Sequence, residues 1–153
     1  MRAVVQRVEK GAVEIKNKEV GSINRGLVVL LGVGKNDSEK DAEYLAEKIV
    51  NLRIFEDMKE KMNLSVKEIN GQILVISQFT LYGDCKKGRR PSFISAALPD
   101  KAKKLYNYFI KCLKDYHVKI ETGEFQAMML VKIYNNGPVT ILLDSEKVIQ
   151  KLQ

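Results

Sequence analysis

The sequence is poor in the residue types on which many catalytic and metal-binding sites depend. Its 153 residues include one histidine, His117, and two cysteines, Cys85 and Cys112, with no CxxC pair. A Ser-His-Asp or Cys-His catalytic site would therefore have to use His117, and a single His with two distant Cys disfavours a zinc site. Two cysteines are too few for a disulfide framework, which favours a reducing cytoplasm. We predict no metal site and no cofactor.

Long apolar segments are also missing. The longest, GLVVLLGVG at residues 26–34, is far too short to span a bilayer, so no membrane association is expected. Charges scattered through the N-terminal segment favour a strand over a signal peptide. No repeat, linker or low-complexity stretch interrupts the chain, and its apolar fraction of 45% is ordinary for a folded protein. These features predict a single domain spanning residues 1–153.

The sequence has an excess of basic residues. Its 26 Lys and Arg residues outnumber 19 Asp and Glu residues, which gives a formal charge of +7. Such an excess favours a polyanionic partner such as nucleic acid, although charge alone is a weak signal. Four of the basic residues, Lys86, Lys87, Arg89 and Arg90, lie in KKGRRP at 86–91. This segment is either a solvated loop or a phosphate-binding loop that follows a nucleic-acid strand.

Apolar periodicity predicts an α+β fold with mostly antiparallel strands and two main helices. Strands are expected at the N-terminus, with a hairpin around Asn17 and Lys18, and as buried runs at 27–33 and from Gly71 to near Gly83. One helix should follow Ser38, whose position suits an N-cap, and the other should begin at Pro99, which suits a first helical turn. The segment GVGKND between the first buried run and the first helix lacks the P-loop residues, so we interpret it as a strand-to-helix turn.

Two short motifs carry candidate chemistry, and each also has a plain structural interpretation. SQFTL at 77–81 interrupts an apolar strand with three hydrogen-bonding side chains, which either bond nearby backbone or line a pocket. NGPVT at 136–140 is expected between two final strands, at about 127–134 and 139–143. Its Gly-Pro step is either a plain hairpin turn or a stiff cis segment that directs two neighbouring carbonyls the same way.

Taken together, these segments resemble the D-aminoacyl-tRNA deacylase family. The shared stretches are MRAVVQRV (1–8), NLRIFED (51–57), SQFTLYGD (77–84), KKGRRPSF (86–93), TGEFQAMM (122–129) and NNGPVT (135–140). They keep the family's order and span nearly the whole chain, and the joint match of SQxTL and NxGPxT is highly specific. The resemblance implies hydrolysis of the ester bond of tRNA charged with a D-amino acid, as chiral proofreading in translation. Glycine mischarged on tRNA(Ala) is a second expected substrate.

The resemblance also implies the family's fold and a homodimer with active sites at the interface. The Gly137-Pro138 step is expected to be cis, to reach into the partner's pocket and to reject L-aminoacyl-tRNA. The implied site residues are Thr80, Phe79 and Ser77 as catalytic candidates; Gln78, Ala102, Phe125, Met129, Gly137, Pro138 and Arg7 for the substrate; and Lys86, Lys87, Arg89 and Arg90 for the acceptor stem of tRNA.

Two departures from the family pattern concern the same site. The family often has Asp before the Gly-Pro step, where this sequence has Asn136. It usually has Gly after the Phe of its GxFGA segment, where this sequence has Gln126. Gln126 is expected to reshape the wall beside the site, which affects substrate breadth more than the reaction.

The expected mechanism is attack by water, helped by the ribose 2′-hydroxyl of the substrate, because Thr80 has no evident base. Backbone N–H groups near Phe79 and Thr80 are expected to form an oxyanion hole. One alternative is a non-catalytic RNA-binding module that uses the same basic loop. Another is a small-molecule esterase with Ser77 or Cys85 as nucleophile, which the excess of basic charge and the single histidine disfavour.

Overall fold

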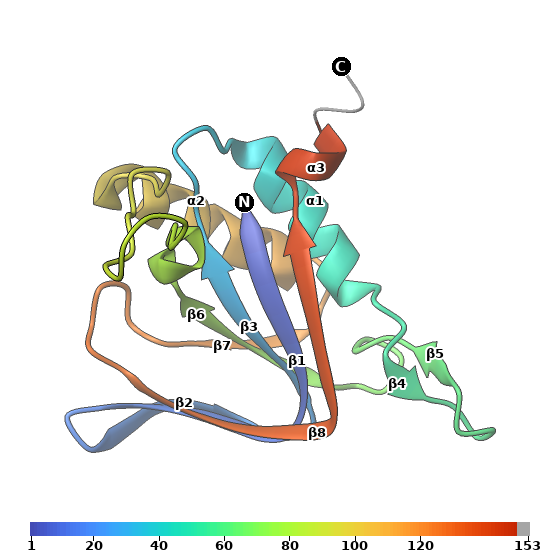
Figure 1. Cartoon of the computed structure of the whole chain (residues 1–153). Helices are drawn as coiled ribbons and strands as arrows, with labels where there is room; N and C mark the ends of the chain where they lie inside the picture. The colour runs from blue at the N-terminus through green and yellow to red at the C-terminus, as the bar shows by residue number, and fades with distance from the viewer. Residues whose placement is uncertain (150–153) are drawn as a thin grey trace.

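The computed structural model describes residues 1–149 and has the predicted α+β architecture, with a curled mixed sheet and two main helices (Figure 1). In chain order the elements are β1 (Arg2–Ile15), β2 (Lys18–Ile23), β3 (Gly26–Gly32), α1 (Glu39–Val50), β4 (Phe55–Glu56), β5 (Met62–Leu64), β6 (Gln72–Ser77), the 3-10 helix η1 (Phe79–Tyr82), α2 (Pro99–Lys114), β7 (Lys119–Thr122), β8 (Leu130–Asp144) and α3 (Glu146–Ile149). Within the described residues, no helix is long and apolar enough to cross a membrane.

Strand β1 organises the main sheet. One of its edges pairs with β8 from Arg2 to Glu14, while the other pairs first with β3 and then with β2. These pairs are antiparallel, whereas β3, β6 and β7 run parallel to one another. The predicted hairpin is confirmed: Lys16 and Asn17 connect β1 to β2 with φ values of 48° and 62°, as a tight primed turn requires.

The helices α1 and α2 cover one face of the sheet and form the larger core with it. Fully buried side chains from both layers meet there, including Val5, Val29, Leu45, Ile49 and Phe109. Both predicted helix starts are confirmed. Ser38 is the N-cap of α1, and its backbone N–H and hydroxyl both donate to Asp41 Oδ2, while Pro99 opens α2.

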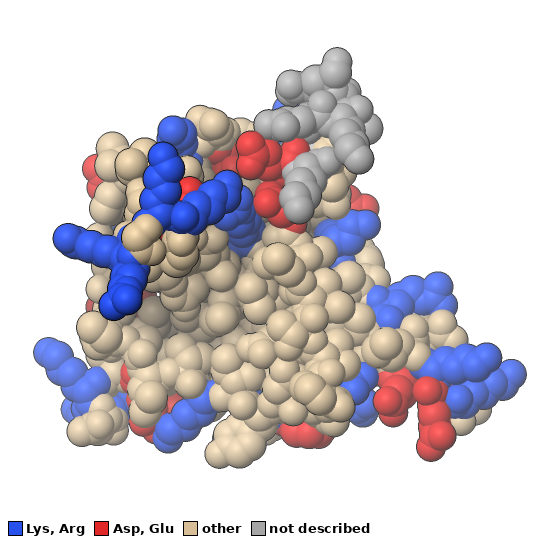
Figure 2. All heavy atoms as spheres, viewed as in Figure 1, with Lys and Arg blue, Asp and Glu red and all other residues tan. Residues whose placement is uncertain are grey.

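The opposite face is closed only in its lower part, where the sheet curls on itself around a second cluster that includes Val13, Val28 and Leu74. Its upper part stays uncovered. There, Leu142, Val4 and Leu30 lie in register across β8, β1 and β3, and Leu142 is 71% exposed. Figure 2 views this uncovered part, which we call the open face, and shows few charged side chains across its centre.

Two expectations about the elements were wrong, and one strand of the main sheet was missed. The two final strands are one strand, β8, because both parts pair with β1 on either side of an irregular stretch. The apolar run from Gly71 ends as a strand at Ser77, and the chain then turns into η1. Strand β7 was not predicted, because its four residues pair only through a parallel neighbour that is distant in sequence.

Candidate active site

The segment from Ser77 to Tyr82 leaves the sheet at the top of the open face. Gln78 N–H donates to Leu31 O at 2.8 Å, which continues the parallel pairing for one residue past β6. The chain then packs so closely over the end of β3 that a Cβ on Gly32 would lie 2.9 Å from Gln78 O. Phe79 and Thr80, the next two residues, are both exposed.

Thr80 is an exposed residue whose hydroxyl and backbone N–H are the groups of interest. Its Oγ1 accepts a hydrogen bond from Gln78 Nε2. In residues 1–149 no imidazole or carboxylate hydrogen-bonds to that hydroxyl, and His117 lies elsewhere, just past the end of α2. The N–H groups of Phe79 and Thr80 make no hydrogen bond within the same residues, as expected for the first residues of a 3-10 helix. The segment thus combines two adjacent free donors with an unassisted hydroxyl.

Phe93 packs against this segment, and the predicted pocket-lining residues lie on α2 and between β7 and β8. The ring of Phe79 meets that of Phe93 edge to face, with centroids 5.0 Å apart. Ala102 lies at the start of α2, facing the core, and Tyr106 one turn later contacts Phe125 with ring centroids 5.7 Å apart. Met129 lies over Gly123, in the connection between β7 and β8 that begins beside the end of β6.

The Gly-Pro corner, residues 136–139, interrupts the pairing of β8 with β1. Val8 pairs with Asn135 and Gln6 pairs with Thr140, so the corner residues have no partner in the register. The Gly137-Pro138 peptide bond is cis, and both residues are exposed. In Figure 1 the corner lies where β8 bends sharply.

Arg7 holds the corner from behind. Its side chain is buried. The guanidinium group donates from Nε to Asn136 O at 3.0 Å and from Nη1 to Ile54 O at 2.8 Å. Gly137 has a φ of +123°, and a Cβ there would lie 2.7 Å from Arg7 Nη2. Any larger residue at this position therefore strains the backbone and pushes against the arginine that fixes it.

Both departures from the family pattern have a structural setting. Asn136 donates from Nδ2 to Glu9 Oε1, a hydrogen bond that an aspartate at this position could not make. Gln126 has a φ of 66°, in the left-handed region that favours glycine. The common family glycine at that position is therefore explained by backbone conformation.

The corner and the Thr80 segment lie far apart in one chain. Arg2 donates from Nη1 to Leu81 O at 3.1 Å, whereas Arg7, five residues further along β1, holds the corner. An extended strand covers about 16 Å over that interval. Among the described residues, no hydrogen bond or ring contact joins residues 136–139 to residues 77–82.

The basic segment forms a closed loop between η1 and α2. Asp84 and Ser92 exchange two backbone hydrogen bonds of 2.8 and 2.9 Å, which tie its base. Lys86, Lys87, Arg89 and Arg90 are all exposed, and none has an ion pair within residues 1–149. Figure 2 shows Lys and Arg side chains gathered at the upper left, over the part of the chain that joins η1 to α2.

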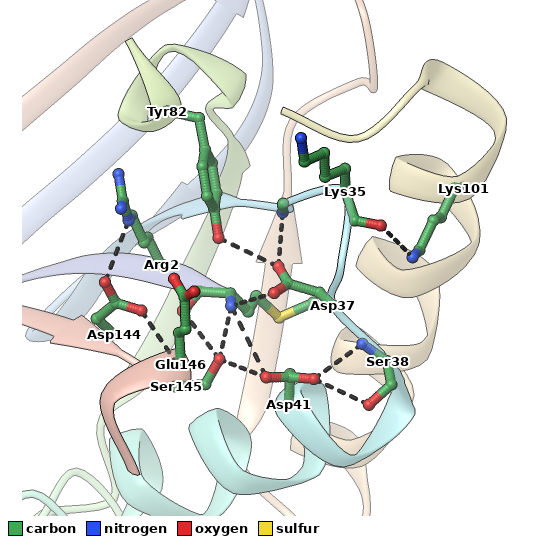
Figure 3. Close-up of polar contacts among 12 residues, drawn as sticks. Arg2, Lys35, Asp37, Ser38, Asp41, Tyr82, Lys101, Asp144, Ser145 and Glu146 are labelled. Atoms are coloured by element: carbon green, nitrogen blue, oxygen red, sulfur yellow. Dashed lines mark hydrogen bonds and ion pairs between the residues drawn. The ribbon is translucent and has the colours of Figure 1, made fainter. Parts of the chain in front are cut away.

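A buried polar cluster beside η1 was missed by the sequence analysis. It joins the ammonium group of Met1 to Asp37, Asp41 and Ser145, with Tyr82 at its edge (Figure 3). Burial alone would raise the pKa of Asp41, but hydrogen bonds from Ser145 and Ser38 and the nearby ammonium group hold it below its usual value. No local sequence pattern signals this cluster, because its members come from both ends of the described chain, from the loop before α1, from α1 itself and from η1.

Comparison with solved structures identifies the fold. A chain named c-Myc DNA Unwinding Element Binding Protein superposes with a TM-score of 0.89 at 40% identity, over 94% of this chain and 98% of that one. A chain described as a probable eukaryotic D-amino acid tRNA deacylase superposes with a TM-score of 0.80 at 18% identity, over 93% and 97% of the two chains. The fold is that of the D-aminoacyl-tRNA deacylases, as predicted.

Sequence comparison identifies the family. The family profile described as D-Tyr-tRNA(Tyr) deacylase matches residues 4–144. The D-aminoacyl-tRNA deacylase of Thermosipho melanesiensis is 63% identical over 149 residues, which are 97% of this chain and 99% of that protein. That of Alkaliphilus metalliredigens is 59% identical over 147 residues, 96% and 99% of the two chains. The chain belongs to the D-Tyr-tRNA(Tyr) deacylase family, and the predicted enzyme class, an ester hydrolase acting on aminoacyl-tRNA, is confirmed.

Proposed function

We propose that this deacylase hydrolyses D-aminoacyl-tRNA to the free D-amino acid and tRNA, rejects L-aminoacyl-tRNA, and acts in the cytoplasm as a homodimer. Glycine mischarged on tRNA(Ala) is a second substrate, because glycine has no side chain to exclude. The observation that carries the proposal is that the exposed Thr80 segment and the exposed Gly-Pro corner are held by the same strand, β1, but too far apart to meet within one chain.

A second copy of the chain brings the two parts together. The open face supports this step, since Val4, Leu30 and the largely exposed Leu142 present apolar side chains in register across three strands. Uncharged faces of this kind are typical of the buried centre of homodimer interfaces. In the dimer, the corner of one protomer enters the pocket of its partner beside Ser77, Gln78, Phe79 and Thr80.

The Gly137 and Pro138 carbonyls provide the chiral selection. They accept hydrogen bonds from the α-ammonium group of a D-aminoacyl ester and occupy the space into which an L side chain would point. Arg7 and Asn135 fix this backbone: Arg7 donates to Asn136 O at 3.0 Å, and Val139 N–H donates to Asn135 Oδ1 at 3.0 Å. An L-residue must then clash or give up the hydrogen bonds of its ammonium group, so a rigid backbone rejects it.

The ester is cleaved by water rather than by a protein nucleophile. The free N–H groups of Phe79 and Thr80 stabilise the oxyanion, a contribution typically worth ~10²–10³ in rate for each donor. Thr80 Oγ1 already accepts from Gln78 and has no base to remove its proton, so its hydroxyl positions water. The ribose 2′-hydroxyl of the substrate assists, and Ser77 supports the wall. Phe125, Met129 and Ala102 line the pocket for the terminal adenosine and the aminoacyl group.

The basic loop positions the acceptor stem. Lys86, Lys87, Arg89 and Arg90 are free to contact phosphates, because none is paired with a carboxylate in residues 1–149. Since the loop begins directly after η1, a stem held there presents its 3′ end to the Thr80 segment.

The test is single-turnover deacylation of D-tyrosyl-tRNA and L-tyrosyl-tRNA side by side, with and without EDTA. We expect fast release of D-tyrosine alone, unaffected by EDTA. Equal release from both substrates would contradict the role of the Gly137 and Pro138 carbonyls. Binding of both tRNAs without release of either would favour the RNA-binding module.

The variant Thr80→Ala separates the two routes of attack. We expect it to keep partial activity, because water remains the nucleophile and the backbone donors are unchanged. Complete loss of activity, together with a covalent adduct trapped on Thr80 of the wild-type protein, would establish Thr80 as the nucleophile instead.

A further inference from the structure

The ammonium group of Met1 is buried next to the proposed active site. Met1 is fully buried, and its nitrogen donates to Asp37 Oδ1 and to Ser145 Oγ, each at 2.6 Å (Figure 3). Asp41 Oδ1 lies 3.9 Å away and accepts a hydrogen bond from Ser145 Oγ at 2.6 Å. An isolated charge is rarely buried without partners, and here the cation has two carboxylates within reach.

Asp37 links the Met1 ammonium group to η1. Its second oxygen, Oδ2, accepts from Gly34 N–H at 2.6 Å and from the Tyr82 hydroxyl at 3.2 Å. Tyr82 is the last residue of η1, and its own burial together with Asp37 raises its pKa, so the hydroxyl stays protonated and remains a donor. A chain of three groups, Met1 ammonium, Asp37 carboxylate and Tyr82 hydroxyl, therefore ends at the helix that carries Thr80.

Arg2 holds the same end of η1 from the other side. Its guanidinium lies 4.5 Å from the centre of the Tyr82 ring and donates from Nη1 to Leu81 O at 3.1 Å. Asp144 accepts from Arg2 Nε at 3.2 Å and so orients the guanidinium. Arg2 thus contacts the last two residues of η1 directly, and Met1 is linked to Tyr82 through Asp37, which leaves η1 little freedom to shift against β3.

We propose that the α-ammonium group of Met1 is a positioning group for deacylation, acting through Asp37 and Tyr82 to fix the free N–H groups of Phe79 and Thr80. This inference rests on the proposed role of η1 as the oxyanion-binding element. Donors that stabilise a transition state must be held to within a fraction of an ångström, and a misplacement of 1 Å typically costs on the order of 10²-fold in rate. Converting the ammonium to an amide removes the positive charge from beside Asp37 and leaves a buried carboxylate without its cation, which disturbs the bond to Tyr82.

The first experiment compares the protein with the Met1 nitrogen in a peptide bond and the same protein with it as a free ammonium group. The protein is prepared with an N-terminal extension whose protease site is cut to leave Met1 as the first residue, and the same preparation is assayed before and after cleavage. Before cleavage we expect kcat for D-tyrosyl-tRNA to be lower by about tenfold or more, with KM within about twofold, and full recovery after cleavage. An unchanged kcat overturns the proposal, and so does a rise in KM alone, since that outcome means that the extension obstructs tRNA.

A second pair of variants tests the path through Tyr82. Tyr82→Phe removes only the hydroxyl that donates to Asp37, whereas Tyr108→Phe removes a similar hydroxyl, 2.6 Å from Glu43 Oε1, on the helical side of the molecule. We expect kcat to fall in Tyr82→Phe and to stay unchanged in Tyr108→Phe, measured at a temperature where both are folded. Equal kcat in the two variants overturns the proposal, because a merely structural cluster would lower only the melting temperature.

The same assays separate this inference from the function on which it rests. If wild-type protein fails to deacylate D-tyrosyl-tRNA, the proposed function fails. If wild-type protein is active and Thr80→Ala reduces the rate while the extended protein and Tyr82→Phe keep full kcat, the function stands and the positioning role of Met1 is wrong.

Discussion

At the scale of single residues, Asn136 shows how a departure from the family pattern can be accommodated. Its side-chain amide donates to Glu9, and its backbone carbonyl accepts from Arg7, so one residue links the corner to two positions of β1. An aspartate in its place has no amide N–H to donate and would put a second carboxyl group beside Glu9.

We predict that Asn136→Asp lowers kcat/KM for D-aminoacyl-tRNA, because repulsion from Glu9 moves the corner. Glu9→Gln in the same chain restores a donor and should recover most of the loss. The interaction energy from the resulting double-mutant cycle is expected to be on the order of 0.5–1 kcal/mol. Additive effects of the two substitutions would show that Glu9 does not hold the corner.

Gln126 occupies a backbone conformation that suits glycine better than glutamine. With a φ of 66°, its Cβ crowds the following carbonyl, at a typical cost of about 1–2 kcal/mol. Glycine removes this strain but loses more entropy on folding, by roughly 0.5–1 kcal/mol.

We therefore predict that Gln126→Gly raises the free energy of unfolding by about 0.5–1 kcal/mol, measured by urea denaturation. Ala127→Gly is the matched control. Because Ala127 has no positive φ, this substitution relieves no strain and should lower the free energy of unfolding by a similar amount. Destabilisation by both substitutions would mean that the Gln126 side chain makes contacts that outweigh the backbone strain.

At the scale of elements, the sequence predicted those parts of the fold whose signal is local. Apolar spacing, the Ser38 cap and Pro99 located the helices, and uninterrupted apolar runs located β3 and β6. Strand β7 and the continuity of β8 depend instead on partners distant in the chain, which no short window contains. The same limit applies to the site: SQFTL is a local signal, whereas the partners of Met1 lie 36 and 144 residues away.

The basic loop is an element whose contribution can be measured separately. We predict that reversing the charges of Lys86 and Arg89 to Glu weakens tRNA binding and lowers the slope of log Kd against log salt by roughly 1.4–1.8, about 0.7–0.9 for each of the two phosphates that the loop no longer neutralises. The binding is measured over a series of salt concentrations.

Lys59 and Lys61 provide the matched control for the basic loop. Both are exposed in the turn between β4 and β5, so reversing them changes the net charge equally at a different place. If the two double variants show the same decrease in affinity and in salt dependence, only net charge matters and the loop is not part of the tRNA path.

At the scale of the whole molecule, the open face decides whether one chain can work alone. We predict that Leu142→Glu dissociates the dimer and abolishes deacylation, because it places a charge opposite Val4 at the centre of that face. Met58→Glu, at a side chain that is 103% exposed in the β4–β5 turn, should change neither property. Sedimentation and single-turnover assays measure both, and an active monomeric Leu142→Glu protein would contradict the shared site.

Strand β1 sets the spacing between η1 and the Gly-Pro corner. Its residue Arg2 touches η1, its residue Arg7 touches the Gly-Pro corner, and the pleated backbone between them has a fixed rise for each residue. One inserted or deleted residue in that interval would change the length by one step and also turn one of the two guanidinium groups to the wrong side of the sheet. The number of residues between Arg2 and Arg7 thus sets the distance between the two halves of the site. Side-chain substitutions along the strand do not change that distance.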